Sequence, residues 1–256
     1  PQLHKLPLIR DHSFLYDKLY CRYFDKPWHF HEEYELVLIE QSRGTKVIGD
    51  HVSLFGEGEL ILIGSNIPHL FRNDEEYYQK NGKLKASSIF LHFREDFAGA
   101  DFFDLPEMKG VRKLLDNSHF ALQVHGKIRR WIISKLQEMS GQAPAQRLLS
   151  LLEILIRLSE SRELQSLLSN DFVARSRAMK MTNNPKDTER IHRVFEYILK
   201  NYKQEIYLQE IAGILNMSPV SFSRYFKHHT RKTFSEYVTE VRISHACSLL
   251  MQENEN

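Results

Sequence analysis

The spacing of apolar residues changes once along this chain, and the change limits the folds that the chain can adopt. Up to about residue 93, apolar residues occur in short segments separated by glycines, which is the pattern of β-strands joined by turns. After Pro106 the apolar residues recur every three or four positions, as they do on one face of an α-helix. The sequence therefore predicts an α+β protein with a β-rich first part and an α-helical last part.

Several short strands with turn residues between them are expected in the first part. The predicted strands are 34–39, 45–48, 51–55, 59–63 and 86–93. Glycines separate these segments, for example Gly44, Gly49 and Gly56. Closely spaced strands of this kind are typical of a β-barrel or a β-sandwich, and we expect an N-terminal antiparallel β-barrel.

Two helices are expected to pack beside the barrel, at about 127–139 and 145–169. The second contains a stretch, 148–158, with more apolar residues than one helix face requires. Either both helices only cover the barrel, or the surplus face meets a second copy of the chain. We expect a homodimer.

The predicted domain boundary lies in a segment with few large apolar residues. This segment, 171–187, contains Asn183, Asn184 and Pro185 and is interpreted as a linker. It separates an N-terminal domain, 1–170, from a C-terminal helical domain, 188–256.

The composition agrees with a folded, cytoplasmic protein but does not by itself point to a partner. Of the 256 residues, 42% are hydrophobic, enough for a sizeable core. Cys21 and Cys247 offer neither a disulfide framework nor a cysteine-rich metal site. No apolar run reaches the length of a membrane span, so we expect a cytoplasmic location and no membrane contact. The formal net charge is only +2, so an argument for nucleic acid must come from local charge.

Three helices with short connections are expected in the C-terminal domain, at 188–202, at 208–215 and from Pro219 onward. Ser218 supplies an N-cap oxygen for the third helix, and proline is favoured at the first helical position. On this helix Phe222 and Phe226 are four residues apart and predict a buried face. The residues that then face solvent are Val220, Ser223, Arg224 and Lys227.

The third helix and the residues after it carry a local excess of positive charge. No Asp or Glu occurs between Asn216 and Ser235, and the basic residues there are Arg224, Lys227, Arg231 and Lys232. A field of this sign attracts DNA phosphates. Arg224 and Ser223 are the predicted base contacts, whereas Lys227, Arg231 and Lys232 are the predicted phosphate contacts. The alternative is a small helical bundle with a solvated basic end.

Four segments of the C-terminal part belong together: 208–218 (LQEIAGILNMS), 222–227 (FSRYFK), 233–238 (TFSEYV) and 242–250 (RISHACSLL). They resemble the first helix-turn-helix and the linker helix of the AraC/XylS family of transcription regulators, over about 191–250. The resemblance implies that Val220, Ser223 and Arg224 face the major groove and that double-stranded promoter DNA is the partner.

The sequence departs from this family in three places, the first of which is Tyr207, where a Ser or Thr cap is common before the second helix. Arg231 stands where family members usually have glycine, which costs roughly 1 kcal/mol if the backbone there is left-handed. The family also carries a second helix-turn-helix after the helix expected here at about 234–251, whereas the sequence ends at Asn256. We therefore expect the sequence to be part of a longer protein.

The first part contains a histidine-rich motif. Alternation places His29, His31 and Glu35 on one side of a strand. Farther on, the spacing of the second cupin motif is found at Gly58, Gly64, Asn66, His69 and Asn73, with Gly64 and Asn66 in place of the usual Pro and Gly. The stretch 20–93 therefore resembles a cupin, which implies a jelly-roll-like barrel. The residues that match the cupin metal ligands are His29, His31, Glu35 and His69.

Two interpretations of these four residues stay open. Either they hold a divalent metal such as Zn, Fe, Mn or Ni, or they form hydrogen bonds with a polar ligand and with one another. No cofactor is required in the second case. We expect the four residues and Trp28 to mark a ligand pocket, where Trp28 either stacks on a sugar or fills the core.

Three hypotheses on function follow. The leading one is a sequence-specific DNA-binding transcription regulator, not an enzyme, that responds to a small molecule in the barrel, with a sugar as one candidate. The second is a metal-dependent cupin enzyme, a dioxygenase or an isomerase. The third is a module that recruits a partner protein through the surplus apolar helix face.

Overall fold

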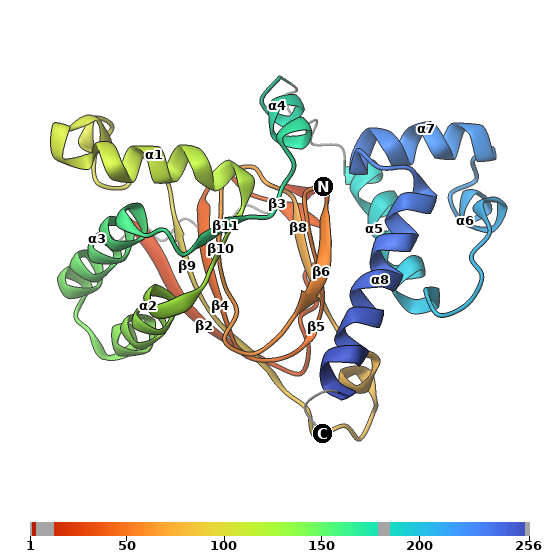
Figure 1. Ribbon diagram of the computed structural model, residues 1–256, viewed down its shortest axis with the longest axis horizontal. Coiled ribbons are helices and arrows are strands. Elements are labelled where there is room, and N and C mark those ends of the chain that lie inside the picture. The colour runs from red at the N-terminus through yellow and green to blue at the C-terminus, as the bar shows by residue number, and fades with distance from the viewer. Residues whose placement is uncertain (1, 4–12, 179–184, 254–256) are drawn as a thin grey trace.

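Two facing β-sheets lie between two groups of helices in the computed structural model, which describes residues 2–3, 13–178 and 185–253. Helices α1 to α3 lie on one side of the sheets, and helices α5 to α8 lie on the other (Figure 1). The predicted α+β class is confirmed, with an N-terminal β region of the jelly-roll kind and a C-terminal helical region.

Each sheet brings together strands from distant parts of the sequence. The five-stranded sheet has the order β1 (Gln2–Leu3), β3 (His29–Phe30), β8 (His69–Asn73), β5 (Gly44–Ile48) and β6 (His51–Phe55). The six-stranded sheet has the order β11 (Leu164–Ser166), β10 (Leu122–Val124), β7 (Leu60–Ile63), β4 (Tyr34–Gln41), β9 (Ala86–Phe93) and β2 (Phe14–Cys21). The pairs are antiparallel except β1 with β3, which is parallel.

Alternation along the strands divides the barrel interior from an outer core. In β4, Leu36 and Leu38 point out of the barrel and join the cluster that packs against helices α1 to α3, whereas Val37 and Ile39 point into the barrel. Neighbouring residues of a strand face opposite sides of the sheet. Because Leu36 to Ile39 are all apolar, this strand contributes to both cores.

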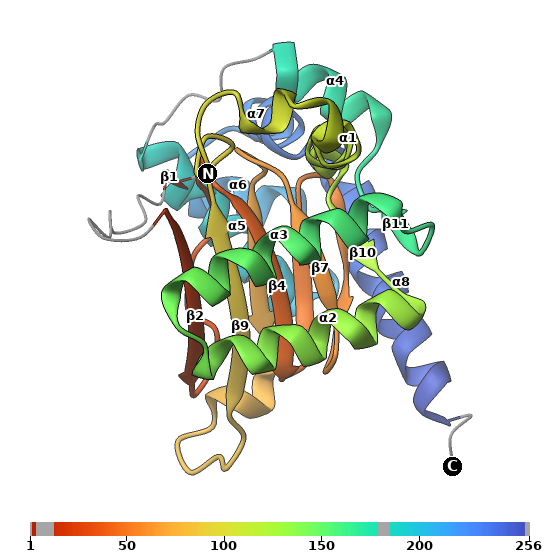
Figure 2. The same cartoon turned by 90° about the vertical axis from the view of Figure 1, so that its left-hand side faces the viewer.

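Helices α1, α2 and α3 cover the outer face of the six-stranded sheet (Figure 2). Their bounds are Lys109–Asn117, Gly126–Glu138 and Pro144–Glu160. Short 3-10 helices occur at Glu75–Tyr78, Phe102–Asp104, Pro106–Met108, Ser118–Phe120 and Met139–Gly141. In α3 the buried apolar residues Leu151, Ile154, Leu155 and Leu158 follow helical spacing and face the sheet, and each buries surface worth about 2 kcal/mol.

The expected helix at 145–169 is too long. Helix α3 ends at Glu160, and residues Leu164–Ser166 form strand β11, which pairs with β10. Ser161 has extended backbone angles and ends the helix. Hydrogen bonds with β10 determine the conformation of the residues that follow α3. No local sequence pattern predicts this pairing.

The expected linker at 171–187 is also partly wrong. Helix α4 spans Asn170–Ala178, and Phe172 and Val173 in it are buried in the barrel cluster. The amide of Phe172 donates to Ser169 Oγ at 3.1 Å, which caps the helix. A Cβ added to Gly49 would lie 2.8 Å from the Phe172 ring, so glycine makes room for this contact. Residues 179–184 of the expected linker lie outside the described residues.

The C-terminal region consists of α5 (Pro185–Asn201), α6 (Leu208–Ile214), α7 (Pro219–Thr230) and α8 (Phe234–Glu253). Helix α5 begins three residues before the expected start at Thr188, and α6 to α8 lie where the sequence predicts them. These helices share a hydrophobic cluster with the barrel residues Trp28, Val47, Val52 and Leu70. Within the described residues, none of the helices has the length and apolarity that crossing a membrane requires.

Candidate functional site

Helix α7 has the start that its sequence predicts. The turn after α6 contains Asn216, which has a left-handed backbone conformation with φ of 53°. Ser218 is the N-cap, and its Oγ accepts a hydrogen bond from the amide of Ser221 at 3.2 Å. Pro219 occupies the first turn, where its missing N–H costs nothing. These local signals fix where the helix begins and therefore which residues share a face.

The exposed face of α7 lies opposite its buried face. Phe222 and Phe226 are fully buried in the cluster shared with the barrel. Val220, Arg224 and Lys227 are exposed and are spaced i, i+4 and i+7, so they form one stripe along the helix. The structure thus brings three of the predicted DNA contacts into a line that a groove could accept.

The other predicted DNA contacts have partners inside the protein. Ser223 Oγ donates to the carbonyl of Pro219 at 2.9 Å, so its hydroxyl keeps only its acceptor lone pairs for DNA. Lys232 Nζ forms an ion pair with Glu240 at 2.5 Å, which offsets its charge. Arg231 is the C-cap of α7 with φ of 63°, the left-handed conformation that favours glycine. Its backbone therefore ends the helix at a cost, as the departure from the family pattern predicts.

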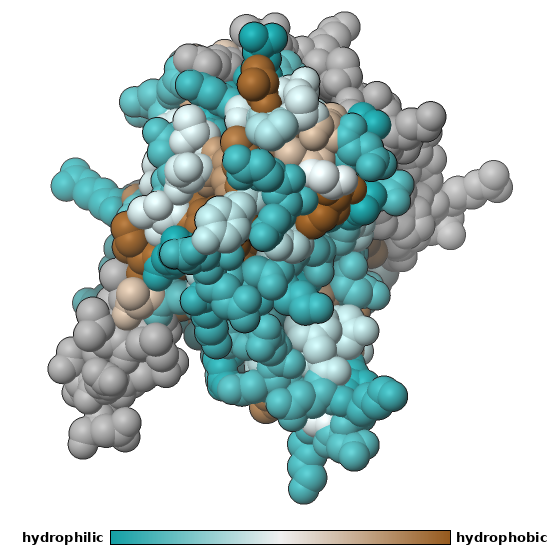
Figure 3. All heavy atoms as spheres, turned by 90° about the vertical axis from the view of Figure 1, so that its right-hand side faces the viewer, coloured by the Kyte–Doolittle hydropathy of each residue, from teal (hydrophilic) through white to brown (hydrophobic). Residues whose placement is uncertain are grey.

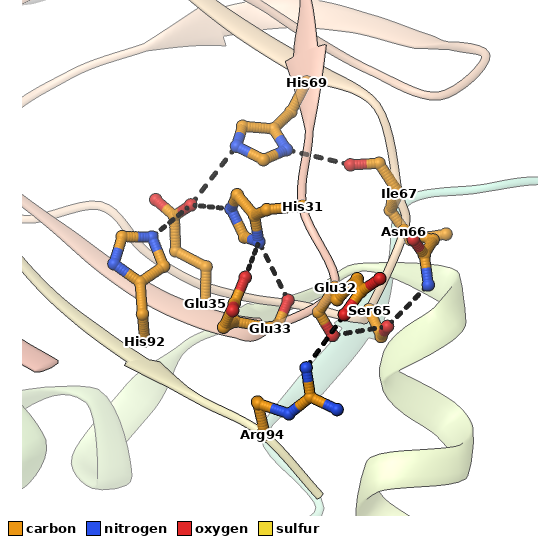
Figure 4. A network of polar contacts seen from close by, with 10 residues as sticks. All are labelled: His31, Glu32, Glu33, Glu35, Ser65, Asn66, Ile67, His69, His92 and Arg94. Atoms are coloured by element: carbon orange, nitrogen blue, oxygen red, sulfur yellow. Dashed lines mark hydrogen bonds and ion pairs between the residues drawn. The ribbon is translucent and has the colours of Figure 1, made fainter. Parts of the chain in front are cut away.

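A second candidate site lies inside the barrel, where three histidines surround one carboxylate (Figure 4). Glu35 Oε2 lies 2.9 Å from His31 Nε2, 3.0 Å from His92 Nε2 and 3.2 Å from His69 Nε2. The fourth imidazole, His29, has its ring centroid 4.3 Å from that of His69. All five side chains are buried. The strands that carry them are β3, β4, β8 and β9, and His31 follows β3 directly.

Backbone carbonyls orient three of these imidazoles. His29 Nδ1 lies 2.8 Å from the Pro27 carbonyl, His31 Nδ1 lies 2.9 Å from the Glu33 carbonyl, and His69 Nδ1 lies 2.9 Å from the Ile67 carbonyl. A carbonyl only accepts, so these Nδ1 atoms carry the hydrogen. In a neutral ring the Nε2 atom then keeps a lone pair, which is how metal-binding histidines are usually held.

Burial and neighbouring charges shift the pKa values of Glu35, His29 and His92. Burial acts to raise the pKa of Glu35, but the neighbouring His92 and His69 outweigh it and hold that pKa well below its usual range. Burial and, to a smaller extent, the charge of His69 together lower the pKa of His29 to about 2. Burial also lowers the pKa of His92. The buried carboxylate is therefore stabilised by positive charge beside it, which protonated imidazoles or a bound cation can supply.

The donor atoms fall into two overlapping sets, each within 4.8 Å: His29, His31 and His69, and His31, Glu35 and His92. Sequence reasoning missed His92. Its position opposite Glu35 depends on the register between β4 and β9, which the sequence does not print. The one signal for His92 in the sequence is its position between two apolar residues of a predicted strand, Leu91 and Phe93.

Trp28 does not belong to this site. It is only 1% exposed, and its ring packs edge-on against Phe195 of α5, with centroids 5.0 Å apart. Trp28 and His29 are neighbours, so they point to opposite sides of the barrel wall. Of the two roles considered for Trp28, the core role is the one that the structure supports.

The barrel contains a further buried charged pair that sequence reasoning missed. Lys46 in β5 forms an ion pair with Glu59, and its Nζ also donates to the Leu54 carbonyl at 3.1 Å. Glu59 in turn accepts a hydrogen bond from Gln123 Nε2 at 3.1 Å. Each charged group already has ion-pair and hydrogen-bond partners within the protein, so this pair requires no further ligand.

Comparison with known proteins finds relatives over most of the chain. It is 24% identical over 235 residues to the HTH-type transcriptional activator RhaS of Klebsiella pneumoniae strain 342, covering 90% of this chain and 76% of that protein. RhaS of Pectobacterium atrosepticum is 22% identical over the same shares. No family model matches the chain.

One further relative matches a short segment of the chain, and solved structures align with low sequence identity. The bifunctional transcriptional activator/DNA repair enzyme AdaA of Bacillus subtilis is 35% identical over 68 residues, 27% of this chain and 32% of that protein. Among solved structures, ToxT of Vibrio cholerae O395 aligns with a TM-score of 0.38 and 12% identity, over 94% of this chain and 85% of that chain.

Proposed function

Because this chain belongs to the AraC/XylS family of transcription regulators, we propose that it binds promoter DNA through α7 and that a small molecule in the barrel controls this binding. The observation that carries the proposal is the exposed stripe of Val220, Arg224 and Lys227 on a capped helix that contains no acidic residue. The positive side chains attract phosphates, and a helix of this width fits the major groove. We also propose that it acts in the cytoplasm.

Two strands connect the barrel site with the DNA-binding helices. His29 and His69 point into the barrel from β3 and β8, whereas their neighbours Trp28 and Leu70 lie in the cluster shared with α5 to α8. A ligand that moves these imidazoles therefore also moves the surface on which the helices rest. Ligand binding changes the DNA-binding region only through such a difference between two states.

Polar contacts across the same interface support this route. Arg72 of β8 forms an ion pair with Glu196 of α5. Thr45 Oγ1 is hydrogen bonded to His245 of α8 at 3.0 Å, and Ser244 Oγ donates to the Val52 carbonyl at 3.3 Å. These directional bonds fix how the helices sit on the five-stranded sheet, so a shift in the sheet changes their position.

We further propose that the buried cluster holds a divalent metal ion. The fit rests on the Nδ1 contacts to carbonyls, which leave the Nε2 atoms of His31 and His69 turned toward Glu35, and on His92 Nδ1, which is buried without a hydrogen-bond partner. The residues that would hold the ion are His29, His31, Glu35, His69 and His92. A bound ion would supply the positive charge to which a hydroxyl- or carboxylate-bearing effector, for example a sugar, could attach.

The enzyme alternative rests on this cluster alone. The relatives that match over most of the chain are named transcriptional activators, and AdaA matches over 68 residues only. We propose that the barrel binds its ligand without converting it.

We also propose a homodimer formed through α3. Leu149 is 59% exposed and Ile156 is 38% exposed, and both lie on the side of α3 that faces away from the sheet. The same surface contains Trp131 of α2, whose ring carries the Arg157 guanidinium 4.1 Å from its centroid. Two copies of this surface would bury each other, and two DNA-binding helices on paired half-sites gain effective concentration.

Titration of labelled promoter DNA with the purified protein tests the leading proposal. Fluorescence anisotropy should show selective binding that weakens steeply as salt increases, because Lys and Arg displace counterions from phosphates. Binding that does not distinguish promoter from random DNA, at any salt concentration, would reject it. Turnover of a small substrate without DNA binding would favour the enzyme alternative.

A further inference from the structure

One apolar side chain lies in the exposed stripe of α7. Val220 is 63% exposed and occupies the first turn of the helix, one turn before Arg224. The rest of the stripe is basic, and Ser221, Ser223 and His228 on its flanks are polar and exposed. In Figure 3 the upper part of this side of the molecule, where α7 lies, has separate hydrophobic spots within a hydrophilic surface.

We infer that Val220 contacts the methyl group of a thymine in the major groove and thereby helps to select the DNA sequence. The inference rests on the proposed DNA-binding role of α7 and deepens it. Thymine is the base that presents a methyl group in the major groove, and apolar side chains recognise it there. A valine in the stripe matches that group in size and polarity.

The other side chains in the first turn are engaged within the helix. Ser218 Oγ accepts from the Ser221 amide and donates to Ser221 Oγ at 2.9 Å. Ser223 Oγ donates to the Pro219 carbonyl at 2.9 Å. Val220 therefore provides the free contact area at the end of the helix that enters a groove first.

Charge favours DNA over a protein as the occupant of this stripe. Arg224 and Lys227 follow Val220 on the same face, and no acidic residue occurs between Asn216 and Ser235. A valine surrounded by this much positive charge fits a polyanion that displays a methyl group. A purely apolar partner surface would leave both basic groups without partners.

The helix geometry predicts a spacing within the recognised DNA. Four residues separate Val220 from Arg224, which corresponds to a rise of about 6 Å along the helix. Base pairs are stacked at about 3.4 Å. If Arg224 contacts a guanine, the thymine contacted by Val220 should lie about two base pairs away.

Selection followed by single-methyl deletion tests the inference. The purified protein is used to select its preferred site from a pool of random DNA duplexes. Each thymine of that site is then replaced singly by deoxyuracil, which lacks only the methyl group, and binding is measured by anisotropy. At one thymine the replacement should weaken binding about fourfold, the effect of burying one methyl group. The same replacement should weaken the binding of Val220→Ala by a smaller factor, because alanine covers less of the methyl group.

The control is Ile243→Ala, because Ile243 is a β-branched residue of α8 that is 56% exposed. This variant should lose affinity on the deoxyuracil site by the same factor as the unaltered protein. Indifference of the unaltered protein to every replacement would overturn the inference, and so would equal sensitivity of Val220→Ala. Either result with sequence-selective binding intact would leave the proposed function standing, whereas failure to select any sequence would overturn both.

Discussion

At the level of single residues, Arg224 and Lys227 face the same way on α7 but are expected to make different contacts. Arg224→Ala should cost roughly 1–3 kcal/mol on the preferred site and little on random DNA, because a bidentate contact to guanine is lost. Lys227→Ala should weaken both by a similar factor and reduce the salt dependence by about one counterion. Anisotropy on both duplexes separates the two. Equal losses for Arg224→Ala would make it a phosphate contact.

The buried carboxylate makes a second prediction at this scale. Glu35→Gln should weaken the binding of Zn²⁺ or Ni²⁺ by more than about tenfold, because it removes the negative charge of the cluster. Binding should also weaken at low pH, where histidines take up protons in competition with the ion. Calorimetric titration measures both. Glu32→Gln is the control, since that carboxylate is exposed and paired with Arg94, and an equal loss there would contradict the assignment.

The neutral state of His29 predicts how stability depends on pH. An unfolded imidazole binds a proton as pH falls through about 6.5, whereas the pKa of native His29 is lowered to about 2 by burial and by neighbouring His69. The unfolded state therefore gains its proton first, and stability falls as pH decreases from 6.5 toward 2. At pH 5 the loss is about 2 kcal/mol. Urea unfolding without metal at pH 7 and 5 measures it, and His29→Asn should show a smaller difference.

The same residues show what the sequence could and could not predict. Ser218 and Pro219 are local signals, and the start of α7 followed from them directly. The contact of His92 with Glu35 joins residues that are far apart in the chain. The ion pair between Lys232 and Glu240 joins the connection before α8 to a residue within that helix. Tertiary packing determines these partners, so a local pattern identifies the residue types but not which residues are in contact.

At the level of elements, strand β3 and the residue before it join the two parts of the molecule. Trp28→Ala should destabilise the protein by about 3 kcal/mol, because a fully buried aromatic ring is lost from the shared cluster. We also expect the single unfolding transition to split in two. Urea unfolding followed by circular dichroism measures both effects. Tyr20→Ala, at an exposed aromatic residue, should cost less than about 0.5 kcal/mol; two transitions in the unaltered protein would contradict the prediction.

The elements that sequence reasoning placed correctly carry their signals within or directly beside the segment. Strands β4, β6 and β9 between turn residues and the capped helix α7 are examples. It missed the end of α3, strand β11 and helix α4, where Leu164 to Ser166 pair with β10 and Phe172 fills the space beside Gly49. In both places a neighbouring element supplies the stabilising contacts, so the deciding information lies outside the segment.

At the level of the whole molecule, self-association through α3 is testable. Sedimentation at micromolar concentration should report a dimer, and Leu149→Glu combined with Ile156→Glu should convert it to a monomer, because charged groups cannot be buried in a symmetric apolar contact. Leu105→Glu, at an exposed leucine outside α3, is the control and should remain dimeric. A monomer in the unaltered protein would move any pairing of subunits onto the DNA.

The hydrophobic cluster that joins the barrel to α5–α8 also limits how the two parts can be recombined. Val47, Val52 and Leu70 lie on the barrel side of this cluster, and Phe195 and Val241 lie on the helical side. A chimaera that joins this barrel to the DNA-binding helices of another regulator would bring together two surfaces that were not shaped for each other. Such a fusion would keep its ability to bind DNA but lose its response to ligand unless these contact residues are transferred with the helices.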